Sequence, residues 1–277
     1  MAVLSLHTHN SATPTITRRS LLSFHVTMAA IQHLRNDAIH SLLINLSKDE
    51  TIAFRDIIEK TFEDFSTGGE RERQPAPCIS NRPDDRRILY RGFSSESKMG
   101  VKIVVEPPTK AGGTKDPIRG AILLMDGQGI PTAILDAEEV TGYRTSTNVM
   151  VPFCWRKKVD QIIIFGTGVQ ALWHSRLILR LRGLEVRTIT YVGSSKIRAD
   201  DLITRIIREN DERWKSPVLF DFLGATSAAF QDEIKSRLAT VDYVFYTTPS
   251  RKPLFPAHYL TGRLRSEHDD TIESIDW

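Results

Sequence analysis

The stretch QIIIFGTGVQALWH, residues 161–174, constrains the fold of this chain more than any other. A run of β-branched residues stops at a glycine pair and passes directly into residues that favour a helix. Gly166, Gly168 and Ala171 form a G-x-G-x-x-A pattern at this transition. There the first glycine permits a tight turn, the second lets a pyrophosphate approach the backbone, and the small third residue keeps the helix close to the sheet. The pattern predicts a dinucleotide-binding turn; the alternative is a turn that only joins a buried strand to a buried helix.

The rest of the second half alternates between strand-like and helix-like segments. Strands are expected at 161–165, 188–192, 217–222 and 242–248, and helices at 168–183, 196–214 and 227–239. This βαβαβ succession predicts a parallel, doubly wound sheet. We therefore expect an α/β fold with a Rossmann-type domain over residues 156–260.

The first half of the chain has a different pattern. Residues 33–46 and 47–67 are expected to be helices. The second is opened by a Ser47–Glu50 capping box, has an apolar face from 57 to 65, and is stopped by Gly68 and Gly69. Residues 70–91 are rich in charge and proline, which predicts a surface loop. Strands are expected at 101–106, 120–126 and 130–136, the last two forming a hairpin around Gly-Gln-Gly. These segments predict an α+β domain over residues 28–155 with a mostly antiparallel sheet.

The segment YVGSSKIRADD, residues 191–201, bears on the choice of cofactor. A carboxylate at the end of the second strand would bind a ribose 2′-hydroxyl and repel a 2′-phosphate. Here Ser194 and Ser195 offer hydrogen bonds, and Lys196 and Arg198 offer positive charge, before any acid appears. The sequence therefore favours NADP(H), with NAD(H) as the alternative. A plainer reading is that Lys196 and Arg198 are only the solvated start of a helix.

Composition argues against several other classes of protein. The net charge of +3 arises from 37 basic and 34 acidic residues mixed along the chain, too weak a bias to indicate a nucleic-acid partner. Cys78 and Cys154 have no metal-ligand spacing, so neither a metal site nor a disulfide framework is expected. No apolar run approaches the roughly 20 residues that span a bilayer, so no membrane partner is expected.

The first 27 residues contain no Asp or Glu, are rich in Ser and Thr, and carry Arg18 and Arg19. This composition resembles a mitochondrial transit peptide. The alternative is an untranslated leader read from an upstream start, because Met28 opens the first segment of folded character. We expect a cytoplasmic protein unless residues 1–27 direct it to mitochondria.

The segment RGAILLMDGQGIPTAILDAEEVTGYRTSTNVMV, residues 119–151, followed by GTGVQALWH, resembles the ornithine cyclodeaminase and mu-crystallin family. In that family a strand-turn-strand unit leads into a T..RT helix start and then into a G-x-G-x-Q-A turn. The resemblance covers roughly residues 34–256 and is most specific at 124–174. It implies an α+β substrate-binding and dimerisation domain before the Rossmann domain, a homodimer, and a small amino or imino acid substrate.

The resemblance also implies roles for individual residues. Lys102 matches the substrate lysine of the family and Arg144 its RT-motif arginine, so both are candidate catalytic residues. Four further residues are implied to bind the cofactor: Thr145, Val169, Gln170 and Thr247.

The expected chemistry agrees with these residue types. Hydride transfer to a carbon that bears nitrogen and a carboxylate needs a guanidinium for the carboxylate and a cation near the nitrogen. The plainer alternatives are that Arg144 pairs with Glu138 or Glu139 and that Lys102 points to solvent.

The chain departs from the family pattern in two places. The second carboxylate-binding arginine is not recognisable, and Arg82 and Arg91 are both left open as its replacement. Residues 261–277 do not resemble the glycine-rich strand expected there, which predicts a truncated or differently spliced member with a disordered tail.

The sequence thus predicts an NAD(P)H-dependent oxidoreductase that acts on the C–N bond of amino or cyclic imino acids, similar to a ketimine reductase. One alternative is a catalytically impaired homologue that only binds nucleotide. The other is a cyclodeaminase-type lyase, which is less favoured because its aspartate-bearing strand is not found.

Overall fold

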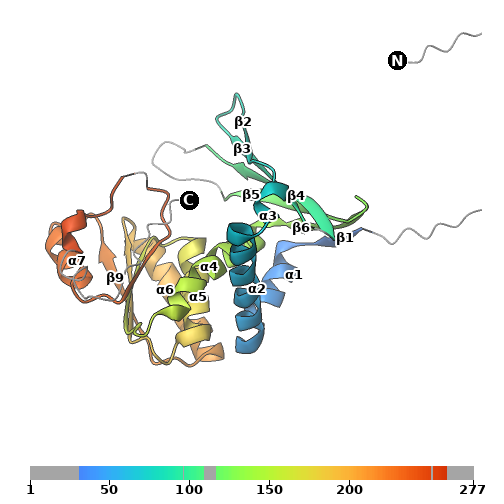
Figure 1. Ribbon diagram of the computed structural model, residues 1–277. Coiled ribbons are helices and arrows are strands. Elements are labelled where there is room, and N and C mark those ends of the chain that lie inside the picture. The colour runs from blue at the N-terminus through green and yellow to red at the C-terminus, as the bar shows by residue number, and fades with distance from the viewer. Residues whose placement is uncertain (1–30, 96, 109–116, 251, 261–277) are drawn as a thin grey trace, which may run out of the picture. The chain divides into compact units, whose positions relative to one another are not determined.

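The computed structural model describes residues 31–95, 97–108, 117–250 and 252–260 of the chain. The expectations for residues 1–27 and 261–277 lie outside these ranges. The described residues form a six-stranded sheet and a four-stranded sheet with helices packed around them (Figure 1).

The six-stranded sheet is mostly antiparallel, as predicted. Its strands follow the order β1-β6-β5-β4-β3-β2, and β1 pairs in parallel with β6 whereas the other pairs are antiparallel. The strands are β1 (Gln32–Leu34), β2 (Cys78–Asn81), β3 (Arg87–Ser94), β4 (Lys98–Glu106), β5 (Arg119–Asp126) and β6 (Pro131–Asp136). Gly129, in the predicted turn between β5 and β6, has a φ of 84°.

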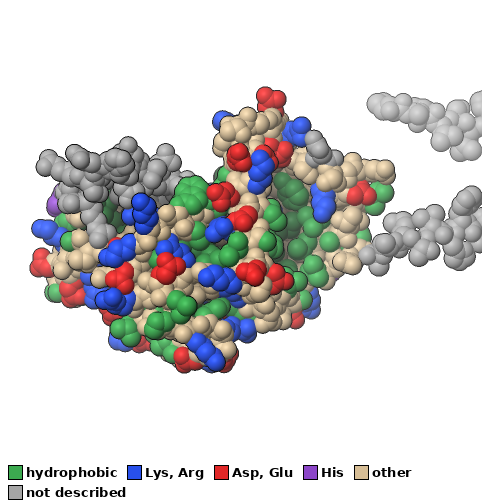
Figure 2. Space-filling model, turned by 60° about the horizontal axis from the view of Figure 1, so that its bottom comes forward, with side chains coloured by type: hydrophobic (Ala, Val, Ile, Leu, Met, Phe, Trp, Pro, Cys, Tyr) green, Lys and Arg blue, Asp and Glu red, His purple; other side chains and the backbone are tan. Residues whose placement is uncertain are grey.

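The prediction of a surface loop over residues 70–91 was wrong. This segment contains the short helix α3 (Glu70–Arg73), β2 and the first part of β3, and β2 and β3 form the hairpin at the top of Figure 1. Asp85, with a φ of 61°, lies in the connecting turn. Charge and proline are common at sheet edges, where they prevent further pairing, and this concealed the strand pattern. Figure 2 shows that hydrophobic side chains gather in a hollow beside this hairpin.

Two helices precede the sheet's hairpins, α1 (Asn36–Ile44) and α2 (Lys48–Thr67). The capping box of α2 is confirmed, because Ser47 Oγ accepts from the Glu50 N–H at 3.2 Å and Glu50 Oε2 accepts from the Ser47 N–H at 2.7 Å. The apolar face of α2 is only partly covered, and Ile57 is 64% exposed.

Helix α4 (Ala137–Trp155) connects the two sheets and packs against β4, β5 and the helices α1, α2 and α5. It lies close to α5 (Val169–Arg182) at Gly142, where an added Cβ would be 2.5 Å from the Trp173 ring. Helix α4 therefore packs against both sheets, against β4 and β5 of the first and, through Phe153, against Phe245 of the second.

The four-stranded sheet confirms the predicted Rossmann-type arrangement. All pairs are parallel, in the order β10-β7-β8-β9, the strands being β7 (Gln161–Phe165), β8 (Thr188–Gly193), β9 (Leu219–Gly224) and β10 (Tyr243–Tyr246). The other helices are α6 (Lys196–Arg213), α7 (Phe230–Leu238) and the short 3-10 helix η1 (Ala257–Tyr259). Ile162 and Ile164 pack into one hydrophobic cluster with α5, whereas Ile163 and Phe165 pack into another with α7. The sheet is thus covered on both faces, which explains the continuous apolar run in β7.

None of the helices in the described ranges has the length and apolar character that a membrane span requires. The same ranges contain no group of three or more His, Cys, Asp or Glu residues placed to hold a metal ion.

Candidate functional site

The glycine turn lies where the strand order of the parallel sheet reverses, between β7 and β10. Ligands of doubly wound sheets bind at this position, beyond the carboxyl ends of the strands. Gly166 has a φ of 121°, and an added Cβ would be 2.4 Å from Thr247 Oγ1. Its N–H donates to the Val192 carbonyl at 2.8 Å. The fold itself therefore requires glycine at this position.

Gly168 differs from Gly166 because the fold itself does not require it. Its φ of −100° and ψ of −166° suit any residue, and an added Cβ would meet nothing within 4 Å. It is the N-cap of α5 and provides no side-chain cap, and the next residue, Val169, is 61% exposed. Ala171 is fully buried. The first turn of α5 therefore offers backbone N–H groups and a positive helix end to an anion, and a dinucleotide phosphate fits this space.

Three other expected cofactor residues lie on elements next to this turn. Thr247 follows β10, and its hydroxyl donates to the Phe165 carbonyl at 2.8 Å, which fixes the turn from the neighbouring strand. Thr145 lies on α4, half-buried, next to Ser146. Gln170 is the second residue of α5, and its side-chain oxygen lies 3.5 Å from Ser146 Oγ.

A buried histidine, which the sequence did not single out, joins α4 to the glycine turn. His174 Nδ1 lies 2.9 Å from Ser146 Oγ and 2.7 Å from the Gln170 carbonyl oxygen. Burial lowers the pKa of His174 to about 4. The ring is therefore neutral at physiological pH and acts as a hydrogen-bonding link between the two helices.

Lys102 and Arg144 are brought together, and Arg91 joins them. Lys102 on β4 and Arg91 on β3 are direct cross-strand partners, so their side chains leave the same face of the sheet. This is the face toward α4, because Ile122, the β5 partner of Lys102, is buried on it. Burial, and then the charges of Arg144 and Arg91, lower the pKa of Lys102 to about 8. We call these three residues the basic cluster.

Neither acidic residue named as an alternative partner of Arg144 is paired with it. Glu138 accepts a hydrogen bond from Asn36 Nδ2 at 2.5 Å, and Glu139 accepts one from Trp173 Nε1 at 3.0 Å. Oriented so that both ends of its amide are paired, Asn148 accepts from Arg144 Nη1 at 3.2 Å. No carboxylate in the described ranges lies within 4.0 Å of a nitrogen of the basic cluster. The cluster therefore presents positive charge to an anionic ligand.

The structure also separates the two arginines that the sequence left open. Arg91 belongs to the basic cluster, whereas Arg82 lies at the tip of the β2–β3 hairpin, with Nε 3.4 Å from Asp84 Oδ1. Arg91 is recognised by its position opposite Lys102 in the register of β3 and β4. The sequence predicted a loop over residues 70–91 and so did not reveal this register.

The residues directly after β8 include no acid, as the sequence showed, but Lys196 is already paired with a carboxylate. Ser194 is exposed, and Ser195 caps α6 by accepting from the Arg198 N–H at 3.4 Å. Lys196 Nζ donates to both oxygens of Asp200, at 2.7 and 2.8 Å. A 2′-phosphate would therefore share Lys196 with Asp200.

In sequence comparisons, no family profile and no curated protein matches this chain. Solved structures do share its fold. The Δ1-pyrroline-2-carboxylate reductase of Thermococcus litoralis, described in complex with NADH and L-proline, superposes with a TM-score of 0.64 at 18% identity, over 83% of this chain and 66% of that one.

Two further structures agree with this result. An archaeal alanine dehydrogenase dimer with bound NAD gives a TM-score of 0.61 at 17% identity, over 83% of this chain and 64% of that one. A probable ornithine cyclodeaminase from Bordetella pertussis Tohama I gives 0.59 at 19% identity, over 83% and 65%. The chain spans about two thirds of the length of these proteins. The resemblance seen in the sequence is thus confirmed at the level of the fold.

Proposed function

We propose that this chain is an NAD(P)H-dependent oxidoreductase that acts on the C–N bond of an amino or cyclic imino acid. Residues 28–155 would bind substrate and residues 156–260 the nucleotide. One observation carries the proposal: α4 bears Arg144 of the basic cluster and also contacts the first turn of α5 through Ser146. The solved structures with this fold, described with NADH and L-proline or with NAD, support it.

The nicotinamide, when bound, would supply the hydride for the reaction. The residues of this chain would bind and orient the substrate. The guanidinium groups of Arg144 and Arg91 suit bidentate binding of its carboxylate. Lys102, on the same face of the sheet, would hold a proton against the imine nitrogen and so favour attack at the neighbouring carbon.

The pKa of Lys102 leads to a prediction for the pH dependence of the reaction. If protonated Lys102 assists imine reduction, kcat/KM should be level below pH of about 8 and fall up to tenfold per pH unit above it. In Lys102→Arg, the remaining activity should not fall through this range, because a guanidinium stays protonated. Initial rates over a pH series would test this. An unchanged fall in Lys102→Arg would remove Lys102 from the proton-transfer role.

For the cofactor we propose NADP(H) in preference to NAD(H). Support comes from the sequence Gly-Ser-Ser at the end of β8 and from Lys196 and Arg198, which begin α6. The first acid after β8 is Asp200, and it already neutralises part of the Lys196 charge. We therefore expect a moderate preference.

Lys196→Glu should lower the NADPH preference about tenfold, the effect of losing one charge-assisted hydrogen bond. Fluorescence titrations with NADPH and NADH would measure both dissociation constants. The matched control is Arg187→Glu, which makes the same charge change beside the opposite end of β8. Equal affinities for both cofactors in the unmutated chain would contradict the NADP(H) assignment.

We also propose that the chain forms a homodimer through the face of the six-stranded sheet that α4 does not cover. Val101, Ile103 and Leu123 lie on this face, since they alternate with the residues that face α4. Ile134 lies beside Leu123 and is 36% exposed. A solvated sheet face would carry polar residues, and an apolar one indicates an interface.

Leu123→Lys should convert the dimer to a monomer, because a charge would be buried without a partner at the interface. Sedimentation velocity would give the mass. Ile57→Lys places the same charge on the exposed face of α2 and should leave the mass unchanged. A monomeric parent chain would refute the proposed dimer.

A further inference from the structure

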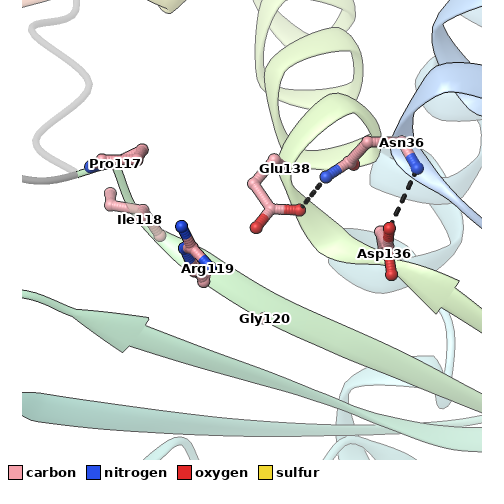
Figure 3. A pocket seen from close by; sticks show the side chains of 7 residues that line it. All are labelled: Asn36, Pro117, Ile118, Arg119, Gly120, Asp136 and Glu138. Atoms are coloured by element: carbon pink, nitrogen blue, oxygen red, sulfur yellow. Dashed lines mark hydrogen bonds between the residues drawn. The ribbon is translucent and has the colours of Figure 1, made fainter.

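A cavity with both polar and apolar lining lies at the end of the antiparallel sheet, where β5 begins and β6 passes into α4. Its volume is about 470 Å³, within the usual range for small-molecule sites. Figure 3 shows its lining, which includes Arg119 and Glu138 on opposite sides and the apolar residues Pro117 and Ile118.

The acidic side of this cavity is held in place. Asn36 Nδ2 donates to Glu138 Oε2 at 2.5 Å, and the Asn36 backbone N–H donates to Asp136 Oδ2 at 3.0 Å. Glu138 Oε1 has no hydrogen-bond partner among the described residues and points into the cavity (Figure 3). The Glu138 carboxylate is thus oriented but can still accept from a ligand.

The basic side is formed by Arg119. Arg119 lines the cavity beside Pro117 and Ile118 (Figure 3), and no carboxylate in the described ranges is within the 4.0 Å of an ion pair with its guanidinium. Arg119 and Glu138 therefore line one cavity without forming a direct ion pair. A ligand that carries both charges could pair with both residues.

We propose that this cavity binds an α-amino acid with a small apolar side chain. Its ammonium group pairs with Glu138, its carboxylate with Arg119, and its side chain lies against Pro117 and Ile118. The cavity volume suits one small zwitterion, and the third charged residue of the lining, Asp136, already accepts from the Asn36 N–H and lies 3.1 Å from His33 Nε2.

This site is separate from the basic cluster and goes beyond the proposed reaction. Arg119 pairs in register with Val105, three residues along β4 from Lys102, and no residue of the basic cluster lines the cavity. Glu138 belongs to the first turn of α4, and Arg144 lies further along that helix. Ligand binding would fix the start of the helix that carries Arg144, which makes the cavity an effector site.

Isothermal titration calorimetry without cofactor tests the proposal. L-valine, L-alanine and L-proline are the amino-acid probes, and isovalerate and isobutylamine each lack one charged group of L-valine. We expect at least one amino acid to bind, with L-valine about tenfold or more tighter than either analogue. Absence of binding by every amino acid at millimolar concentration would overturn the proposal.

Variants of this chain show which residues bind the amino acid. Arg119→Gln and Glu138→Gln should each weaken it about tenfold or more, and Glu138→Gln retains an oxygen for the Asn36 side chain. Arg87→Gln, which removes a cation of the same sheet outside the cavity, should bind as the parent does. Arg144→Ala should also bind unchanged, because it removes only the basic cluster. Loss of binding in Arg144→Ala, with retention in Arg119→Gln, would assign the ligand to the basic cluster and overturn the proposal.

Discussion

Gly168→Asp is expected to weaken dinucleotide binding about 100-fold or more while the protein remains as stable as the parent. An aspartate at this N-cap would accept from the free N–H groups of α5 and interact favourably with the helix dipole. It would also fill the space above the turn and repel the pyrophosphate. A 100-fold loss corresponds to about 3 kcal/mol, the upper part of the range for charged hydrogen bonds.

The neighbouring glycine provides the matched control. Gly166→Ala should lower the stability of the fold, by about 1–3 kcal/mol for the positive φ alone, with further destabilisation from the contact with Thr247. Thermal melts and NADPH titrations of both variants would separate the two effects. Retention of parental NADPH affinity in Gly168→Asp would exclude the turn as the phosphate site.

Arg144→Lys is expected to lower kcat/KM for a cyclic imino acid by about 10- to 100-fold although the charge is kept. A lysine ammonium cannot donate two parallel hydrogen bonds to a carboxylate, and the loss of one such bond costs about 1.5–3 kcal/mol. Asn148, which accepts from Arg144 Nη1, would also lose its partner. The effect should be seen mainly in reactions of substrates that carry the carboxylate.

Two other arginines show whether the effect is specific. Arg91→Lys should also lower kcat/KM, because Arg91 is opposite Lys102 in the register of β3 and β4. Arg82→Lys, at the tip of the hairpin beside Asp84, should leave the kinetics unchanged. Steady-state kinetics of the three variants would compare their effects on kcat/KM. Equal effects of Arg82→Lys and Arg144→Lys would contradict the assignment of the basic cluster as the substrate site.

The second half of the fold could be predicted because its signals are local. The β-branched run of β7, the glycine turn and the start of α5 are contiguous, and β7 is apolar on both faces. The capping box of α2 is equally local, since Ser47 and Glu50 are three residues apart. Such features depend little on distant parts of the chain.

The features that sequence reasoning missed depend on pairing between distant segments. β1 is three residues long and forms only because β6, a hundred residues later, offers an edge. The β2–β3 hairpin is masked by charge, and without its register Arg91 could not be chosen over Arg82. His174 carries no sequence signal as a link, because its partner Ser146 lies on another helix.

The most direct test of the proposed function is product formation by the purified chain. With a cyclic imino acid and NADPH, we expect one molecule of the corresponding cyclic amino acid for each NADPH oxidised, as measured by mass spectrometry and absorbance. Gly168→Asp and Arg144→Lys should both reduce product formation. Parental binding of NADPH without any amino acid product, over a range of cyclic imino acids and pH values below 8, would contradict the proposed reaction.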